Sequence, residues 1–242
     1  MSTLNTMNTM SKHTAVNFSR PFLAILAGLT LISLCACSAL QPSTTPQPTF
    51  YALDNARQAM LSSKQDPVQA VAQSARLTLI VNPPRAAAGF DSQRIIYVRE
   101  PHKLEYFANS EWVDPPALML GPLVVAAVQN SGAFSAVVLT PGAAVGDWRL
   151  DTEIIRLQHE FQTQPSRVRF TLRAYLVDSK TRRVLAWREF DDYAPAESEN
   201  PYGGVLAANL VVQTVLDKLS VFCVDSARAM GQTVVTKTGS NR

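Results

Sequence analysis

The chain has 242 residues, 22 lysines and arginines against 19 aspartates and glutamates, and a formal net charge of +3. This length allows one domain, or at most two, and supplies enough residues for a substantial core. The near balance of charge argues against a nucleic-acid partner, because nucleic-acid binding requires a basic face.

Residues 1–36 have the composition of a secretory signal peptide. Lys12 and Arg20 precede an apolar run from residue 22 to residue 34, and this segment contains no acidic residue. Such an order is typical of a cleaved leader. The run is shorter than the roughly 20 residues that a membrane-spanning helix requires, which makes a transmembrane anchor the weaker alternative.

The end of the leader is more specific. The sequence Leu34-Cys35-Ala36-Cys37 resembles the bacterial lipobox, with leucine at −3, a small residue at −1 and cysteine at +1. The resemblance implies cleavage between Ala36 and Cys37 and attachment of diacylglycerol to the thiol of Cys37. An ordinary signal peptide with two incidental cysteines is the alternative. Because two or more acyl chains anchor a protein stably, we expect attachment to the membrane through this N-terminal lipid.

The mature chain has few cysteines and almost no net charge. Removal of 36 residues leaves 206, of which 20 are basic and 19 acidic. Cys223 is then the one thiol left, so we expect no intramolecular disulfide and a small buried side chain at this position. Ser38, in place of aspartate, follows the lipidated cysteine, which by the lipoprotein sorting rule implies the inner leaflet of the outer membrane.

Residues 37–49 contain the lipidated cysteine, three prolines and no charged residue. This composition predicts a flexible, extended tether that reaches about 30 Å from the membrane. We expect the folded domain to span residues 50–226 and a polar tail to follow at residues 227–242.

The first half of the domain reads as short strands followed by a helix. Strands are predicted at residues 50–53, 76–81, 94–99 and 103–108, the last two as a hairpin, with a short helix opening at Asp66-Pro67. Asp114-Pro115-Pro116 precedes apolar residues at three- and four-residue spacing, which predicts a helix. Gly121-Pro122 predicts a kink or a late start of that helix, and Gly132 its C-terminal cap.

The second half reads as longer strands followed by a second helix. Strands are predicted at residues 137–139, 148–161, 168–176 and 184–190. The apolar parity changes near Ile154-Ile155, which predicts a β-bulge there. Pro201-Tyr202-Gly203-Gly204 leads into a helix with an apolar stripe from Val205 to Leu219. The order predicts an α+β fold: a single two-layer domain with a mostly antiparallel sheet and two helices on one face.

No catalytic or cofactor motif is present. The sequence lacks the nucleophile elbow, the H-E-x-x-H and C-x-x-C motifs, the P-loop and the dinucleotide fingerprint. His102 and His159 lack metal-ligand spacing. The acidic residues between 191 and 199 are expected to form a solvated loop. We therefore expect no enzyme activity, no metal and no cofactor.

Two features are weak candidates for an interface. Arg169 and Arg173, with Arg167, alternate with buried residues of one strand. They indicate either a basic stripe for headgroups or an acidic partner, or a solvated strand face. Trp112 either packs its loop onto the start of the first helix or anchors a partner, since aromatic residues concentrate at interfaces.

Several short sequence words together resemble the ABC-type transport auxiliary lipoprotein family, the PqiC/YmbA-like group. They are Arg94-Ile-Ile-Tyr97, Leu104-Glu-Tyr106, Trp112-Val-Asp-Pro-Pro116 and Ser131-Gly-Ala-Phe134, with Tyr51-Ala-Leu53 and Ala207-Ala208-Asn209. The resemblance covers residues 50–222; Gly121-Pro122 departs from the family pattern.

The resemblance implies a non-catalytic outer-membrane lipoprotein. It implies docking onto an MCE-domain protein that connects to an inner-membrane ABC permease and ATPase, with lipid or another hydrophobic molecule as cargo. A homo-oligomeric ring is a further implication. An independent periplasmic lipid-binding carrier is the alternative, and it would need an apolar cavity between sheet and helices.

Overall fold

The computed structural model describes residues 47–54 and 77–239, with side chains as far as Met230. The expected signal peptide, the lipidation site at Ala36 and Cys37, most of the tether and the expected helix at Asp66 lie outside the described residues. Thr49, which we assigned to the tether, already belongs to the first strand.

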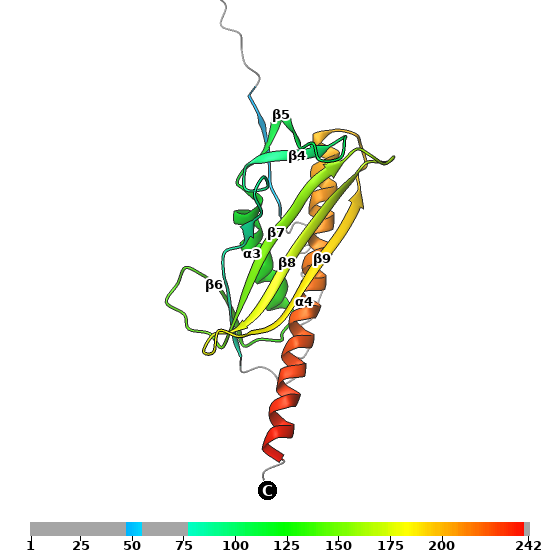
Figure 1. The fold of residues 1–242 in the computed structure, drawn as a ribbon. Coiled ribbons are helices and arrows are strands. Elements are labelled where there is room, and N and C mark those ends of the chain that lie inside the picture. The colour runs from blue at the N-terminus through cyan, green and yellow to red at the C-terminus, as the bar shows by residue number, and fades with distance from the viewer. Residues whose placement is uncertain (1–46, 55–76, 240–242) are drawn as a thin grey trace, which may run out of the picture. The chain divides into compact units, whose positions relative to one another are not determined.

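The described residues of the domain form a nine-stranded sheet with two helices on one face (Figure 1). The strands are β1 (Thr49–Tyr51), β2 (Thr78–Val81), β3 (Arg85–Ala86), β4 (Arg94–Val98), β5 (Glu105–Trp112), β6 (Ala136–Leu139), β7 (Trp148–Glu160), β8 (Arg167–Asp178) and β9 (Val184–Pro195). The helices are α3 (Pro116–Asn130) and α4 (Pro201–Gly239).

Strand β7 organises the sheet. Along one edge it pairs with β8, which pairs in turn with β9, and both pairings are antiparallel. Along its other edge, β7 pairs in parallel with three short strands placed one after another. Strand β2 lies opposite residues 148–150, β3 opposite residues 153–154 and β4 opposite residues 159–160. Strand β6 extends the sheet from β2, and β5 and then β1 extend it from β4.

The predicted fold class is confirmed, with a sheet that is mixed. The long pairings are antiparallel, whereas most of the short pairings at the other edge of β7 are parallel. The register between β7 and β8 shifts between Ile154 and Arg156, which confirms the predicted bulge. The shift keeps both Ile154 and Leu157 in the core.

Helix α3 begins before the proline that was expected to delay it. Its first residue is Pro116, and Pro122 lies inside the helix. The prediction of a late start is therefore wrong. The carbonyl that Pro122 leaves without an intrahelical donor belongs to Leu118, whose side chain is 61% exposed, so water can reach this face. Gly132 follows the helix with φ of +66°, as predicted for a C-terminal cap.

Helix α4 packs along β8 and β9 and continues past the expected start of the tail (Figure 1). We expected a polar tail from residue 227, but Ala227 is still buried and the helical backbone runs to Gly239. Pro201–Met230 is long and apolar enough to cross a membrane, because an 18-residue window within it has a mean hydropathy of 1.5. Half of this apolar segment is buried against the rest of the domain, as in a core helix.

The core lies between the sheet and the two helices. Its largest fully buried side chains come from β2, β7, β8, α3 and α4 and include Phe170, Leu150, Leu120 and Leu216. Cys223 belongs to this core as a free thiol, as predicted, and its burial raises the thiol pKa to about 12. Such a thiol stays protonated and unreactive near neutral pH.

Candidate functional site: the open face of the sheet

The face of the sheet opposite the helices presents charged and aromatic side chains. Along β8, Val168, Phe170 and Leu172 are buried, while Arg167, Arg169 and Arg173 alternate with them on the open face. This pattern follows from the two-residue period of a strand. The predicted half-buried strand is therefore confirmed, and its arginines share one surface.

The arginines of this face are paired with carboxylates of the neighbouring strands. Arg169 forms a two-pronged ion pair with Asp191 of β9, in which Nε lies 2.8 Å from Oδ1. Arg173 Nη2 lies 2.8 Å from Glu189 Oε2 and Nη1 lies 3.7 Å from Glu153 Oε2. The hydrogen bond from Arg169 lowers the pKa of Asp191 below its ordinary value. The predicted basic stripe is thus a neutralised ladder of alternating charge.

Aromatic side chains of β9 flank this ladder. The rings of Trp187 and Tyr175 stack with centroids 6.3 Å apart. Arg167 lies over the ring of Tyr193 at 4.6 Å. Trp187 and Tyr193 are 62% and 63% exposed. Exposed aromatic rings beside arginine are a composition enriched at protein interfaces, so this part of the sheet is suited to bind another surface.

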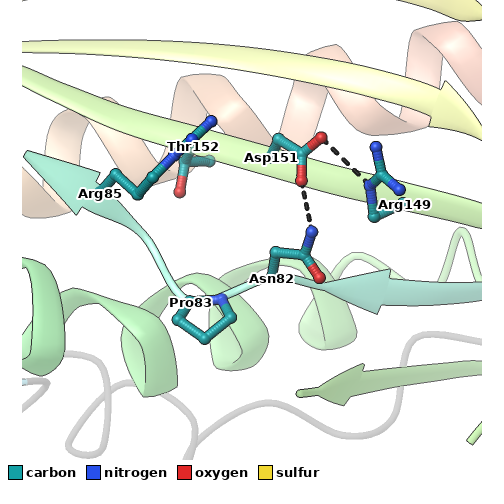
Figure 2. A pocket seen from close by; sticks show the side chains of 6 residues that line it. All are labelled: Asn82, Pro83, Arg85, Arg149, Asp151 and Thr152. Carbon is teal, nitrogen blue, oxygen red and sulfur yellow. Dashed lines mark hydrogen bonds and ion pairs between the residues drawn. The ribbon is translucent and has the colours of Figure 1, made fainter. Parts of the chain in front are cut away.

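A polar groove opens where the sheet is interrupted between β2 and β3 (Figure 2). The linker Asn82-Pro83-Pro84 has three residues where β7 has only Asp151 and Thr152, and the prolines cannot donate to the ladder. The groove has a volume of about 430 Å³. Its lining residues are Asn82, Pro83, Arg85, Arg149, Asp151 and Thr152.

Asp151 is the centre of the hydrogen bonding in this groove (Figure 2). Its Oδ1 accepts from Asn82 Nδ2 at 2.6 Å and its Oδ2 accepts from Arg149 Nε at 3.1 Å. The bond from Asn82 holds the linker to β7, and the bond from Arg149 lies within β7 and orients the carboxylate. The groove offers hydrogen-bonding groups to a polar ligand, but it contains no activated nucleophile.

The predicted interface residues differ in accessibility. Arg169 and Arg173 lie on the open face, each already bound to a carboxylate. Trp112 ends β5 and is only 3% exposed, because it packs in the core. Its ring is buried and not available to a partner, which is against the interpretation of Trp112 as an interface anchor.

Sequence reasoning missed a buried polar cluster at the end of β7. His159 Nε2 lies 2.7 Å from Ser166 Oγ, and the backbone N–H of Ser166 donates to Glu199 Oε1 at 2.9 Å. Burial lowers the pKa of His159, and the charge of Glu199 opposes this shift. His159 and Ser166 are seven residues apart and Glu199 is 33 residues further along. The glycine pair at the start of α4 was the one available signal, because Gly204 lies against His159.

This cluster does not have the geometry of nucleophilic catalysis. The serine lies between the histidine and the glutamate, whereas a catalytic histidine lies between the other two. Ser166 is fully buried, so that its hydroxyl cannot meet a substrate. Among the residues that the structure describes, no group of three or more His, Cys, Asp or Glu side chains is placed to hold a metal ion.

The sequence from residue 60 to residue 220 matches the family of the ABC-type transport auxiliary lipoprotein component. This match covers more than half of the chain. The chain belongs to this family.

The fold of the auxiliary lipoprotein is similar to that of protein XCC0632 from Xanthomonas campestris, of the DUF330 family. The two share 24% sequence identity with a TM-score of 0.60 over 77% of this chain and 97% of that one. An uncharacterised protein of known crystal structure is similar at 11% identity and a TM-score of 0.55, over 72% and 97% of the chains. No curated protein matches the sequence. At these identities the two structures show the shared fold alone.

Membership of this family confirms the predicted resemblance. It makes the chain a lipoprotein of the cell envelope that is associated with an ABC transporter, and it indicates no enzymatic activity.

Proposed function

We propose that this auxiliary lipoprotein is anchored through Cys37 in the inner leaflet of the outer membrane and docks an MCE-domain protein in the periplasm. The MCE protein would connect it to an inner-membrane ABC permease and ATPase. Lipid or another hydrophobic molecule would pass along this assembly. ATP hydrolysis belongs to the transporter in this scheme, and the auxiliary lipoprotein is non-catalytic.

The observation that carries this proposal is the family match over residues 60–220. The lipobox at Leu34 to Cys37 supports the anchor, and Ser38 supports the outer membrane. The open face of the sheet supports a docking role, because its exposed aromatic rings and paired charges suit a protein surface better than a reaction centre.

The space between the sheet and α4 favours docking over lipid carriage. One gap between the sheet and α4, bounded by Ile95, Trp112, Leu157 and Ala208, measures about 10 Å³. This volume holds about one water molecule, whereas an acyl chain needs a cavity many times larger. A carrier would have to bind its lipid elsewhere or separate the helix from the sheet.

Affinity purification from detergent-solubilised membranes tests the proposal. A C-terminally tagged auxiliary lipoprotein is expected to recover an MCE protein together with its permease and ATPase. An unrelated outer-membrane lipoprotein with the same tag is the control and should recover none of them. Recovery of the auxiliary lipoprotein alone, with stoichiometric phospholipid in native mass spectra, would instead support the independent carrier.

A further inference from the structure

The polar groove between β2 and β3 contains a backbone donor that the sheet does not use. Strand β7 pairs with β2 as far as Leu150 and with β3 from Glu153, so the two residues between them face the linker. The N–H of Asn82 donates to Leu150 O at 3.0 Å. Alternate residues of a strand direct their backbone groups to the same edge. The N–H of Thr152 therefore points toward the linker, where no strand of the described sheet accepts it.

The side chain of Thr152 also lacks a hydrogen-bond partner. Thr152 lines the groove and is only 3% exposed. Its Oγ1 atom is buried and makes no hydrogen bond to the described residues. A buried hydroxyl without a partner costs stability, because it has lost its bonds to water and gained none in return. This hydroxyl gains a partner when a ligand oxygen enters the groove beside it.

Arg85 supplies an uncompensated positive charge at the same end of the groove. It is opposed to Glu153, the residue after Thr152, and Figure 2 shows its side chain directed toward Thr152. The carboxylate of Glu153 contacts Arg173 at 3.7 Å, and Arg85 is exposed and has no ion pair with a described residue. The charge of this guanidinium is therefore available to a ligand.

The acceptors that line the groove are already occupied. Both carboxylate oxygens of Asp151 accept hydrogen bonds, one from Asn82 and one from Arg149, and Arg149 balances its charge. The Oδ1 atom of Asn82 accepts from Thr140 at 3.1 Å. These bonds also fix the linker against β7, so the walls of the groove are held in place before a ligand arrives. The hydrogen-bonding capacity left over belongs to donors, which favours an anionic ligand.

We propose that this groove binds a phosphate group, with Arg85 and Thr152 as its main contacts. A guanidinium donates to two oxygens of an oxyanion at once. The N–H and hydroxyl of Thr152 require a further oxygen, which a phosphate has and a carboxylate lacks.

The phosphate group belongs either to a lipid headgroup or to a free phosphate. The groove of about 430 Å³ is larger than one phosphate ion needs, since a water molecule takes up about 30 Å³ of liquid. It therefore has room for the group to which the phosphate is esterified. The inference does not rest on docking to an MCE protein, because every contact in it lies within this chain.

Calorimetric titration of the full-length lipidated protein, purified in a phosphate-free maltoside detergent, tests the proposal. The probes are inorganic phosphate, glycerophosphoethanolamine and acetate, at constant ionic strength because salt screens charged contacts. At least one phosphate compound should bind saturably, and acetate about tenfold more weakly or less, because it lacks the further oxygen. Tighter binding of glycerophosphoethanolamine than of inorganic phosphate identifies a lipid headgroup as the source, and the reverse order identifies the free ion.

Three variants locate the site. R85Q should weaken binding about tenfold or more and leave thermal unfolding unchanged, because the arginine is exposed and has no ion pair with a described residue. T152V keeps the shape of the side chain but removes the hydroxyl. Without ligand it should be at least as stable as the wild type, yet it should bind phosphate more weakly. R228Q removes an exposed arginine of α4 and is the control, with binding as in the wild type.

The opposite results overturn the proposal. A wild-type protein that binds neither phosphate compound has no such site, and one that binds acetate as tightly as phosphate has no site for phosphate in particular. Wild-type affinity in both R85Q and T152V would place the ligand outside the groove. None of these results bears on docking, which the affinity purification tests separately.

Discussion

Gly121 and Gly204 both lie in helices, but the surroundings of their Cα atoms differ. A Cβ atom at Gly121 would meet Pro84 Cδ at 3.4 Å and Leu139 at 3.5 Å, which are ordinary contacts. A Cβ atom at Gly204 would lie 2.6 Å from His159 Nδ1, which is closer than real Cβ contacts. The first glycine departs from the family pattern without a steric need, whereas the second allows α4 to approach His159 of β7.

Alanine substitutions at these two glycines should therefore have opposite effects. G204A is expected to lower the free energy of unfolding by about 1–3 kcal/mol, because the clash forces α4 away from His159. G121A is expected to leave it unchanged or to raise it by up to about 1 kcal/mol, because alanine favours the helix. Urea denaturation of both variants measures the two changes in the free energy of unfolding. A G204A variant as stable as the wild type would contradict the prediction.

His159 makes the stability of the domain depend on pH. Burial lowers its folded-state pKa below the ordinary value of 6.5, against the opposing charge of Glu199. The unfolded chain then binds the proton first, so this group destabilises the fold as the pH falls. Its contribution is fully present above about pH 6.5 and is lost progressively toward the folded pKa.

We predict that H159Q flattens this dependence. Glutamine keeps a hydrogen-bonding group near Ser166 but has no proton to gain in this range. The measurement is the urea midpoint of both proteins at several values between pH 8 and pH 5. The wild type should lose stability toward pH 5 relative to H159Q; a constant difference between the two would show that His159 has the same pKa in the folded and unfolded states.

At the scale of elements, the segment that follows the tether is held by α4 and β5. The N–H of Val113 donates to Tyr51 O at 2.7 Å. Asn209 Nδ2 donates to Ala52 O at 3.1 Å, and the N–H of Asp54 donates to Asn209 Oδ1 at 2.9 Å. Two of the short family words, one near each end of the domain, therefore meet through Asn209, which explains why they occur together.

Replacing Asn209 should loosen this attachment. N209A removes both side-chain bonds to Ala52 and Asp54, and we expect a loss of about 1–3 kcal/mol of stability. The amide of Asp54 should exchange its hydrogen faster in N209A than in the wild type. Q213A is the matched control: Gln213 lies one turn along the same helix, its side chain donates to Asp217, and its loss should change neither quantity. Unchanged exchange at Asp54 in N209A would rule out this role.

At the scale of the whole molecule, one cysteine is expected to decide where the protein resides. C37S removes the thiol that would carry the lipid, so the protein should appear in the soluble periplasmic fraction. C35S places the more usual serine at −2 of the lipobox and should leave the protein in the membrane pellet. Fractionation of cells with immunodetection measures both, and a C37S protein that still pellets would refute the anchor.

Local patterns in the sequence determined the fold class, the β-bulge near Ile154, the alternation of β8 and the family. Each of these predictions depends on residues close together in the chain. Over such short stretches, the spacing of apolar side chains and the turn residues indicate a strand or a helix directly. The predicted lipid anchor rests on a short contiguous motif in the same way. The apolar stripe of α4 was underestimated because it was followed only as far as Leu219, although buried residues continue to Ala227.

Only the tertiary structure decided how these elements face one another. Four features depend on contacts that the periodicity of the sequence does not indicate. They are the three parallel partners of β7, the neutralisation of Arg169 and Arg173, the burial of Trp112 and the contact of His159 with Ser166. Strand pairing and ion pairing depend on which long-range contacts the packed core permits. A side chain's accessibility to a partner follows from that packing, which is why the polar groove between β2 and β3 was visible only in the folded molecule.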